Sequence, residues 1–483
     1  MLALLLCLLP FILGAVLIIK QLLSQNVSEN INSETPPQTP TFNWLIGSSF
    51  ILIWFLSISS YFQTTQTNTI NLSWLPILGS SFHLELAGFS RLMVLLSTTV
   101  SLLIYYFSYK HIQHKNNQFW GLYFLSLTGL IGLFCTKDLL VFYFFWELVL
   151  IPIYFLNALF GKSDKQIFIT SKLFIYTFLG SVLMLVGILS IENALAFPDY
   201  SYDGLIAQTA IISKQKIAFW LIFIGMAVKV PMFPFHSWQP DAYSQAPLPI
   251  ATFMSSLMAK MGLFGIIVWL VPMFSLSLND FRSTIIFVAI IGALYAGLIA
   301  FKQTTIKRWI AFCSMAHLGI MVAACFAGNI YADSGVKMQL FNHGLNVLGL
   351  WLLAYIFEYH FKIQEIDKIK GLARLFPKLT VFIFVNLLAN IALPLTNSFN
   401  AEFLMLNGIF TVSKLAALLG VLTVITTAIY VLHFAQKSIW GSPDLNFENQ
   451  PRLDCNYYIV YILLGVFVFL SGVFPMYQLW HLL

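Results

Sequence analysis

The sequence predicts an all-α, polytopic integral membrane protein with about fourteen transmembrane helices, on three observations. Hydrophobic residues make up 59% of the 483 positions and charged residues only 9%, whereas an ordinary soluble domain has about 25% charged residues. The mean hydropathy is +0.84. Apolar runs of about 20 residues, the length that crosses a bilayer as a helix, recur along the whole chain. This composition excludes a soluble globular domain.

The spans follow from these apolar runs in chain order. The first run, Leu2–Leu23, has no preceding basic residues and no small-residue cleavage site, so we interpret it as a spanning helix and not as a signal peptide. The polar stretch Ser24–Thr41 is expected to be a loop, and Thr69–Leu86 a surface hairpin with Pro76 and Gly79 at its turn. The other expected spans are Phe42–Phe62, Ala87–Phe107, Gln118–Thr136, Leu139–Phe160, Phe168–Ile191, Ile217–Trp238, Pro249–Pro272, Thr284–Phe301, Ile310–Ala327, Met338–Phe357, Leu379–Leu406, Leu415–Ala435 and Asn456–Gln478.

The distribution of basic residues predicts the orientation of these spans. Most lysines and arginines near helix ends fall beside loops that follow odd-numbered helices, such as Lys307, Arg308, Lys368 and Lys370. Short loops rich in Lys and Arg stay on the cytoplasmic or matrix side of a membrane. Both termini are therefore expected on the outer side, and the formal charge of +6 reflects orientation and not nucleic-acid binding.

Two lysines, Lys229 and Lys260, lie near the middle of consecutive apolar segments. An ammonium at that depth costs about 3 kcal/mol unless it has a partner or water, so each is a functional candidate. Lys260 alternatively snorkels to the interface. Pro231 and Pro234 follow Lys229 and must break its helix, and broken backbone at membrane depth persists only where it lines protein or a hydrated cavity. The pattern predicts a hydrated path through the protein interior.

Other ionisable residues lie in the same kind of environment. Glu147, inside FFWELVL, is the expected partner of Lys229, with a purely structural ion pair as the alternative. Lys260 is expected to exchange protons, because burial disfavours its charged form. Glu402 follows Pro394 in a second interrupted helix, where it either ends the path or stabilises the helix start.

Histidines complete the predicted proton path. His317 and His343 lie in apolar helices, where each either relays protons through its two ring nitrogens or is a packed core histidine. His236 and Asp241 lie in the polar segment HSWQPDAYSQAP and either provide proton access or order that loop. The five scattered cysteines predict no disulfide framework, zinc site or iron–sulfur cluster. We expect no cofactor in this chain.

Six phrases in the same order carry a resemblance to a known family: DLLVFYFFWELVLIPIYFL, AVKVPMFPFHSWQPDAYSQAP, MAKMGLFG, CSMAHLGIM, NHGLNVLG and ALPLTNSFNAEF. With them, the chain resembles the antiporter-like membrane subunits of respiratory complex I, the NADH:quinone oxidoreductase. The M type, called subunit 4 in mitochondria, is the most similar, because its L and N relatives have lysine where this chain has Glu402. The resemblance implies that Glu147 and Lys229 pair, that Lys260 is the central channel lysine, that His317 is a relay and that Glu402 is the terminal acid.

The resemblance also implies an architecture and an assembly. It implies two inverted five-helix repeats, at residues 118–272 and 273–436, between an N-terminal part at 1–117 and a C-terminal loop and helix at 437–483, with two discontinuous helices. The chain would be a non-redox, proton-translocating subunit with antiporter-like neighbours on both sides, while NADH, FMN, iron–sulfur clusters and quinone bind partner subunits. A bacterial plasma membrane is expected, with the mitochondrial inner membrane as the alternative.

Three other functions stay open on the sequence alone. A subunit of a multisubunit cation/proton antiporter or of a membrane-bound hydrogenase would share the buried lysines and acids. A non-transporting scaffold would instead tolerate the loss of Lys260 or Glu147 without loss of pumping.

Overall fold

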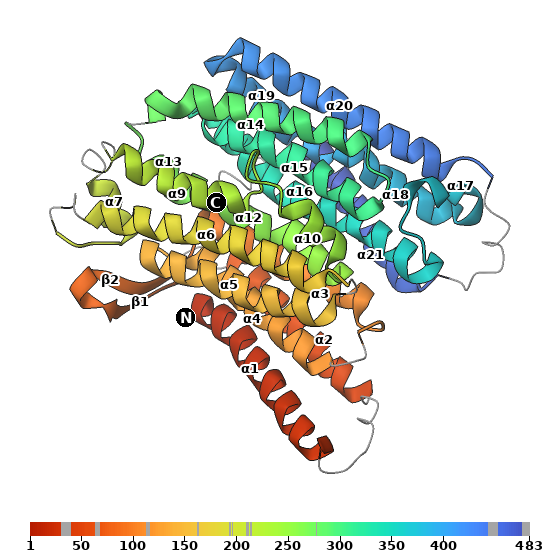
Figure 1. Ribbon diagram of the computed structural model, residues 1–483, viewed down its shortest axis with the longest axis horizontal. Coiled ribbons are helices and arrows are strands. Elements are labelled where there is room, and N and C mark those ends of the chain that lie inside the picture. The colour runs from red at the N-terminus through yellow and green to blue at the C-terminus, as the bar shows by residue number, and fades with distance from the viewer. Residues whose placement is uncertain are drawn as a thin grey trace. The chain divides into compact units, whose positions relative to one another are not determined.

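The computed structural model of the chain describes residues 1–29, 40–62, 68–112, 116–161, 164–192, 195, 197–208, 212, 215–276, 278–442 and 453–475. By packing it divides into two compact units (Figure 1). Unit 1 is Met1–Gly225 with Gln245–Phe253, and unit 2 is Met226–Ser244 with Met254–Leu483. This division rests on packing and does not test the predicted repeat boundaries.

Unit 1 is a bundle of long apolar helices. They are α1 (Leu2–Glu29), α2 (Pro40–Phe62), α3 (Gly88–Ser108), α4 (Asn116–Cys135), α5 (Leu139–Phe160), α6 (Gln166–Glu192), the short α7 (Tyr202–Ala207), most of α9 (Lys216–Lys229) and α11 (Leu248–Phe253). In this unit α4 packs against α1 and α5, while α6 packs on α5. The predicted loop at Ser24–Thr41 is wrong at both ends, because α1 continues to Glu29 and α2 begins at Pro40.

The predicted surface hairpin is confirmed. Strand β1 (Asn68–Leu75) pairs antiparallel with β2 (Ser80–Leu86) through a short 3₁₀ turn, η1 (Pro76–Leu78). Gly79 follows that turn with φ +63°, and a Cβ there would lie 2.0 Å from the Pro198 carbonyl oxygen, so only glycine fits.

Asp138 attaches this hairpin to the helices of unit 1. Its carboxylate accepts hydrogen bonds from the Ser80 hydroxyl at 2.9 Å and the Ser81 amide at 2.9 Å. The same side chain caps α5 by accepting from the amides of Leu140 at 3.0 Å and Val141 at 3.1 Å. One acid therefore fixes both the hairpin and the start of α5.

Unit 2 holds the remaining elements. They are α10 (Gln239–Gln245), η2 (Met254–Met258), α12 (Ala259–Gly265), η3 (Ile266–Leu270), α13 (Val271–Met273), α14 (Leu278–Phe301), α15 (Ile306–Cys325), α16 (Ile330–Ile356), η4 (Phe357–Phe361), η5 (Ile366–Lys368), α17 (Leu372–Leu375), α18 (Pro377–Asn390), α19 (Asn397–Val412), α20 (Lys414–Ile439) and α21 (Cys455–Val473). In the most apolar stretch of 18 residues, 94% of the residues are buried in α15 and 100% in α16, but only 39% in α20. Helices α15 and α16 are therefore the core of this unit.

Twelve helices of the described residues are long and apolar enough to cross a membrane, so a multi-pass membrane protein is confirmed, but the exact count of fourteen is not. The two missing spans are the predicted discontinuous helices. In the first, α9 ends at Lys229, and in the second, α18 and α19 are separate pieces of 14 and 16 residues. The end of the last predicted helix, at Gln478, lies outside the described residues.

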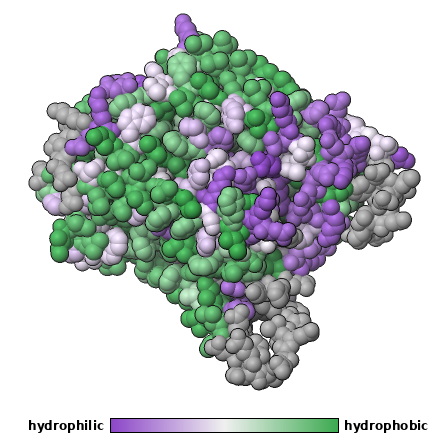
Figure 2. Space-filling model, in the orientation of Figure 1, coloured by the Kyte–Doolittle hydropathy of each residue, from purple (hydrophilic) through white to green (hydrophobic). Residues whose placement is uncertain are grey.

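Apolar side chains cover much of the visible face of the molecule, whereas hydrophilic residues gather mainly on one side of it (Figure 2). Many large apolar residues of the spanning helices are exposed, including Leu298 at 60% and Leu418 at 59%. A bilayer would cover such side chains, as expected of a multi-pass membrane protein.

Candidate functional site

Lys260 lies in a helix whose regular geometry is interrupted on both sides. The π segments η2 and η3 flank α12, and π turns of this kind are frequent at functional sites. The Lys260 side chain is fully buried, and its Nζ donates a hydrogen bond to the Ser255 carbonyl oxygen in η2 at 2.7 Å. The buried hydroxyls of Ser255 and Ser256 have no hydrogen-bond partner among the described residues.

Lys229 is the last residue of α9 and is 1% exposed. The chain then passes through turns until α10 begins at Gln239, which confirms the predicted break at Pro231 and Pro234. The Trp238 indole donates to the Val228 carbonyl at 3.0 Å and so satisfies an acceptor that the broken helix leaves open. Gly262 of α12 has no room for a Cβ, which would lie 2.6 Å from the Met226 carbonyl oxygen. The Lys260 helix therefore packs directly on the broken end of α9.

His317 and His343 face each other in the core of unit 2. His317 is on α15 and His343 on α16, they are 4% and 2% exposed, and their ring centroids are 5.5 Å apart. The helix of Lys260 packs against both of these helices, with η2 on α16 and α12 on α15, and Lys260 lies close to His343. The structure thus brings together Lys260, His343 and His317.

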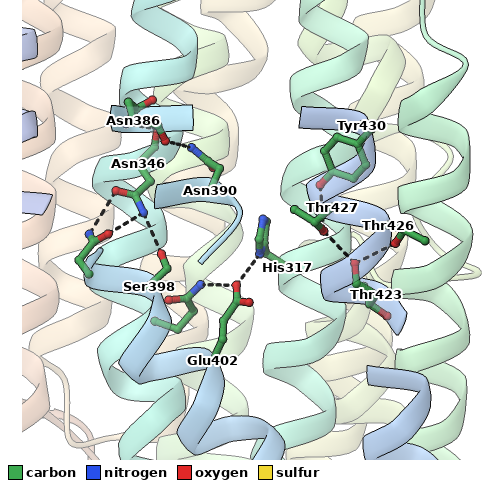
Figure 3. A network of polar contacts seen from close by, with 12 residues as sticks. His317, Asn346, Asn386, Asn390, Ser398, Glu402, Thr423, Thr426, Thr427 and Tyr430 are labelled. Carbon is green, nitrogen blue, oxygen red and sulfur yellow. Dashed lines mark hydrogen bonds and ion pairs between the residues drawn. The ribbon is translucent and has the colours of Figure 1, made fainter. Parts of the chain in front are cut away.

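Glu402 lies beyond the second break and makes direct contacts with this core. It is 3% exposed on α19, and its Oε1 lies 2.9 Å from Nδ1 of His317. Nε2 of Gln339 donates to the same oxygen at 3.1 Å. In Figure 3, His317 and Glu402 lie between a group of amide side chains and a group of hydroxyl side chains.

The amide side chains hold the start of α19. The Asn346 amide donates to Oδ1 of Asn397 at 3.1 Å and to the Ser398 hydroxyl at 2.9 Å (Figure 3). The Asn342 amide donates to the Asn397 carbonyl at 2.8 Å. Ser398 precedes Glu402 by one helical turn, so both lie on the same face of α19. The second predicted break is thereby stabilised by α16.

Several ring and amide atoms of this network have no hydrogen-bond partner among the described residues. They are Nε2 of His317, both ring nitrogens of His343 and Oε1 of Gln339. Buried polar atoms are almost always satisfied by protein or by ordered water. Their positions beside Lys260 and Glu402 are therefore suited to bridging water molecules, which a proton relay through histidine requires.

Asp241 and His236 make contacts with other residues. Asp241 is in the first turn of α10 and forms an ion pair with Arg308 at 2.7 Å. His236 packs its ring against those of Phe233 and Tyr295. These contacts help to order the segment, and a role in proton access stays a prediction.

Glu147 lies on α5 in unit 1, where it is partly exposed. Its Oε1 is buried and has no hydrogen-bond partner among the residues that the structure describes. Lys229 belongs to unit 2, so the pairing of these two residues stays a prediction.

Sequence reasoning missed Gln339, the second hydrogen-bond partner of Glu402. A neutral amide in an apolar helix is not a charge carrier, so it does not stand out in a search for ionisable residues. Its spacing was the available signal, because Gln339 precedes His343 by four residues and shares its face of α16.

The chain is similar in sequence and in fold to known membrane proteins. Residues 136–429 match the family described as "NADH:quinone oxidoreductase/Mrp antiporter, TM". NADH-quinone oxidoreductase subunit M of Rickettsia typhi is 32% identical over 392 residues, which cover 81% of this chain and 78% of that protein. A chain of respiratory complex I from Thermus thermophilus with bound NADH superposes with a TM-score of 0.88 at 26% identity, over 100% of this chain and 98% of that chain. A chain of the Mrp complex from Dietzia shares the fold at 16% identity, with a TM-score of 0.80 over 98% of this chain and 96% of that chain.

Proposed function

Because the chain belongs to the NADH:quinone oxidoreductase/Mrp antiporter family and is similar to its M subunits, we propose that it is a proton-translocating membrane-arm subunit of an NADH:quinone oxidoreductase. The observation that carries the proposal is the buried contact of His317 with Glu402, with His343 and Lys260 beside it in the same unit. Lysine, histidine and glutamate each bind and release a proton, so the set can pass one without a cofactor.

Proton transfer is expected to run through these side chains and bridging water across the middle of the membrane. Lys260 takes up a proton as the neutral amine, His343 and His317 pass it between ring nitrogens, and the Glu402 carboxylate receives it. Opening or closing of a Glu147–Lys229 pair would change the electrostatic potential at Lys260 and so drive the exchange. Quinone reduction elsewhere in the assembly would supply the free energy.

The assembly and its orientation follow from the same proposal. This chain would be the non-redox part of the translocase, with NADH, FMN, iron–sulfur clusters and quinone held by partner subunits. Antiporter-like subunits would flank it on both sides. The membrane would be a bacterial plasma membrane, with both termini on the outer side.

Replacement of the central lysine tests the proposal. In the purified complex reconstituted in liposomes, Lys260→Ala removes the amine that takes up the proton and should lower proton translocation by at least about tenfold. A tenfold loss corresponds to a barrier higher by about 1.4 kcal/mol. Lys337→Ala is the matched control, since Lys337 is a lysine of α16 paired with Asp333 at the surface. Wild-type pumping by an assembled Lys260→Ala complex would contradict the proposal and favour a scaffold role.

Cation/proton antiport is the alternative function, because the chain shares its fold with a chain of the Mrp complex. Sodium flux driven by a pH gradient, in vesicles that contain this chain but lack the redox subunits, would support it. The proposal predicts that no such flux exceeds that of empty vesicles.

A further inference from the structure

A surface cavity of unit 2 is lined by residues that the proposed proton path does not use. It has a volume of about 130 Å³ and lies among the end of α14, the start of α15, η5 and α20. Its lining includes Lys302, Asp367, His433 and Lys437, and Lys437 is paired with Asp367 at 2.6 Å. A cavity of this size and polarity holds several water molecules.

Tyr430 is one of the residues that line this cavity. Its side chain is 1% exposed, so that most of it lies inside the bundle. Its hydroxyl donates to Oγ1 of Thr427 at 3.3 Å, and the Cys313 thiol of α15 lies close to it. Helix α20, which carries Tyr430, packs against α19 of Glu402 and α15 of His317. Tyr430 therefore touches the cavity at one end and the surroundings of the proton path at the other.

The helix spacings extend this contact toward His317. Cys313 precedes His317 by four residues on α15, so the two lie on one face of that helix. Thr423, Thr427 and Tyr430 follow one another at spacings of four and three on α20 and are all buried. Figure 3 shows these hydroxyl residues on the side of His317 opposite to the amide cluster. The Ser314 hydroxyl, also on α15, is buried without a hydrogen-bond partner among the described residues.

We propose that Tyr430, Thr427 and Cys313 line an access branch through which protons exchange between the surface cavity and the His317–Glu402 pair. The inference rests on the proposed function and gives protons a route to the surface that carries Lys302 and Lys437. Each hydroxyl relays by accepting a proton and giving up its own, so no relay group changes its net charge. Water supplies the links where side chains do not touch.

A packing role for Tyr430 is the competing explanation. Its ring lies edge-on to Trp309, with 6.1 Å between the centroids, and Trp309 stacks on Phe434 at 4.4 Å. Packing requires the ring but not the hydroxyl. Tyr430→Phe keeps the ring and removes the hydroxyl, so it separates the two roles.

Proton translocation by the assembled complex is the first readout. Tyr430→Phe and Thr427→Val should each lower the initial rate by about tenfold, since loss of a positioned proton-transfer group costs about that or more. Thr426→Val is the matched control, because Thr426 neighbours Thr427 but bonds only the Thr423 carbonyl of its own helix. Rates for Tyr430→Phe and Thr427→Val equal to that of Thr426→Val would overturn the inference.

Cysteine accessibility in the native complex is the second readout and does not depend on pumping. A small cationic methanethiosulfonate should modify Cys313, as measured by mass spectrometry of its peptide, and Tyr430→Trp should slow this modification. Cys135 is the internal control, because it is also buried but belongs to unit 1 and does not line the cavity. Labelling of Cys313 no faster than that of Cys135 would refute an open branch.

The two readouts separate this inference from the proposed function. If only the branch is absent, Lys260→Ala still abolishes pumping while Tyr430→Phe pumps normally and Cys313 stays unmodified. If the proposed function is wrong, Lys260→Ala pumps like the wild type, whatever the accessibility of Cys313.

Discussion

Glu402 accepts both of its described hydrogen bonds through one oxygen, Oε1, from His317 and Gln339. Hydrogen bonds to a carboxylate favour its charged form, and a bond to a charged group is worth about 1.5–3 kcal/mol. His317 donates in this contact when Nδ1 carries the proton. Gln339 is therefore expected to hold the Glu402 carboxylate in place against His317.

Replacement of Gln339 tests that role. Gln339→Leu should slow proton translocation about tenfold, the effect of losing about 1.4 kcal/mol of carboxylate stabilisation, without loss of assembly. Gln436→Leu, at an exposed position of α20, is the control for the loss of an amide. Equal pumping rates for the two variants would show that Gln339 has only a packing role.

At this scale, the sequence identified the charged groups but not their contacts. His317, His343 and Glu402 stand out as ionisable residues in apolar helices, and the structure brings all three together with Lys260. Which ring faces which carboxylate depends on the rotation of α15 against α19. Apolar helices that are buried on all sides carry no stripe from which that rotation can be predicted.

The amide cluster, formed by the side chains of Asn342, Asn346 and Asn397, holds the second helix break in place. Asn346→Leu removes three side-chain hydrogen bonds, two to Asn397 and one to Ser398, and leaves both residues buried without them, at a cost of about 2–4 kcal/mol. The start of α19 should shift and take Glu402 with it, so pumping should fall more steeply than the amount of assembled complex.

Asn390→Leu is the matched control for this variant. Among the described residues, its amide donates a hydrogen bond to the Asn386 carbonyl, one turn earlier in α18, and none to α19. Pumping rate and assembly should both stay near wild type. An Asn346→Leu complex that pumps like Asn390→Leu would show that the cluster does not position Glu402.

Asp138 is the corresponding attachment for the hairpin of unit 1. Asp138→Ala removes the cap of α5 and the bonds to β2 and should destabilise the chain by about 3 kcal/mol, whereas Asp138→Asn should cost about 1 kcal/mol. Burial raises the pKa of Asp138 above its ordinary value in spite of these hydrogen bonds, so a neutral amide is a fair substitute.

The thermal midpoint of the purified complex at two pH values measures both effects. Because the folded-state pKa of Asp138 is raised, its contribution to stability is full below the unfolded-state pKa and decreases as the pH rises through the folded-state pKa. The wild type should therefore lose more stability than Asp138→Asn as the pH rises from 4 to 8. A larger loss for Asp138→Asn would contradict the direction of the shift.

Both helix breaks were predicted from the sequence, because Pro231, Pro234 and Pro394 lack the amide hydrogen that an unbroken helix needs. The π segments around Lys260 were not, since they contain no proline and read as one apolar run. The extension of α1 to Glu29 was also missed. Its last turn, QNVSE, is polar but contains neither glycine nor proline, so nothing in it stops a helix.

For the molecule as a whole, composition was sufficient to identify the class but not the number of spans. Twelve of the described helices can span, and the broken helices fall short because neither α9 nor α18 reaches the length of a bilayer. Length and hydropathy cannot show whether two short pieces together cross the membrane. The inverted repeats also stay a prediction.

Orientation is testable with single cysteines at two exposed positions. Lys368→Cys lies in the basic loop after α16 and should react only with impermeant maleimide added on the cytoplasmic side. Ile77→Cys, at the tip of the hairpin and 93% exposed, should react only from outside. Both are made with Cys455→Ser, because Cys455 is exposed. Reaction of both positions from one side would overturn the predicted topology.

The central claim is that Glu402 binds and releases a proton during turnover. Infrared difference spectroscopy of the complex, triggered by NADH, measures this directly through the carbonyl stretch of protonated carboxyl groups. A band should appear that is absent in Glu402→Gln and retained in Glu358→Gln, whose carboxylate is instead paired with Lys307 at 2.8 Å. A spectrum unchanged by Glu402→Gln would contradict the central claim.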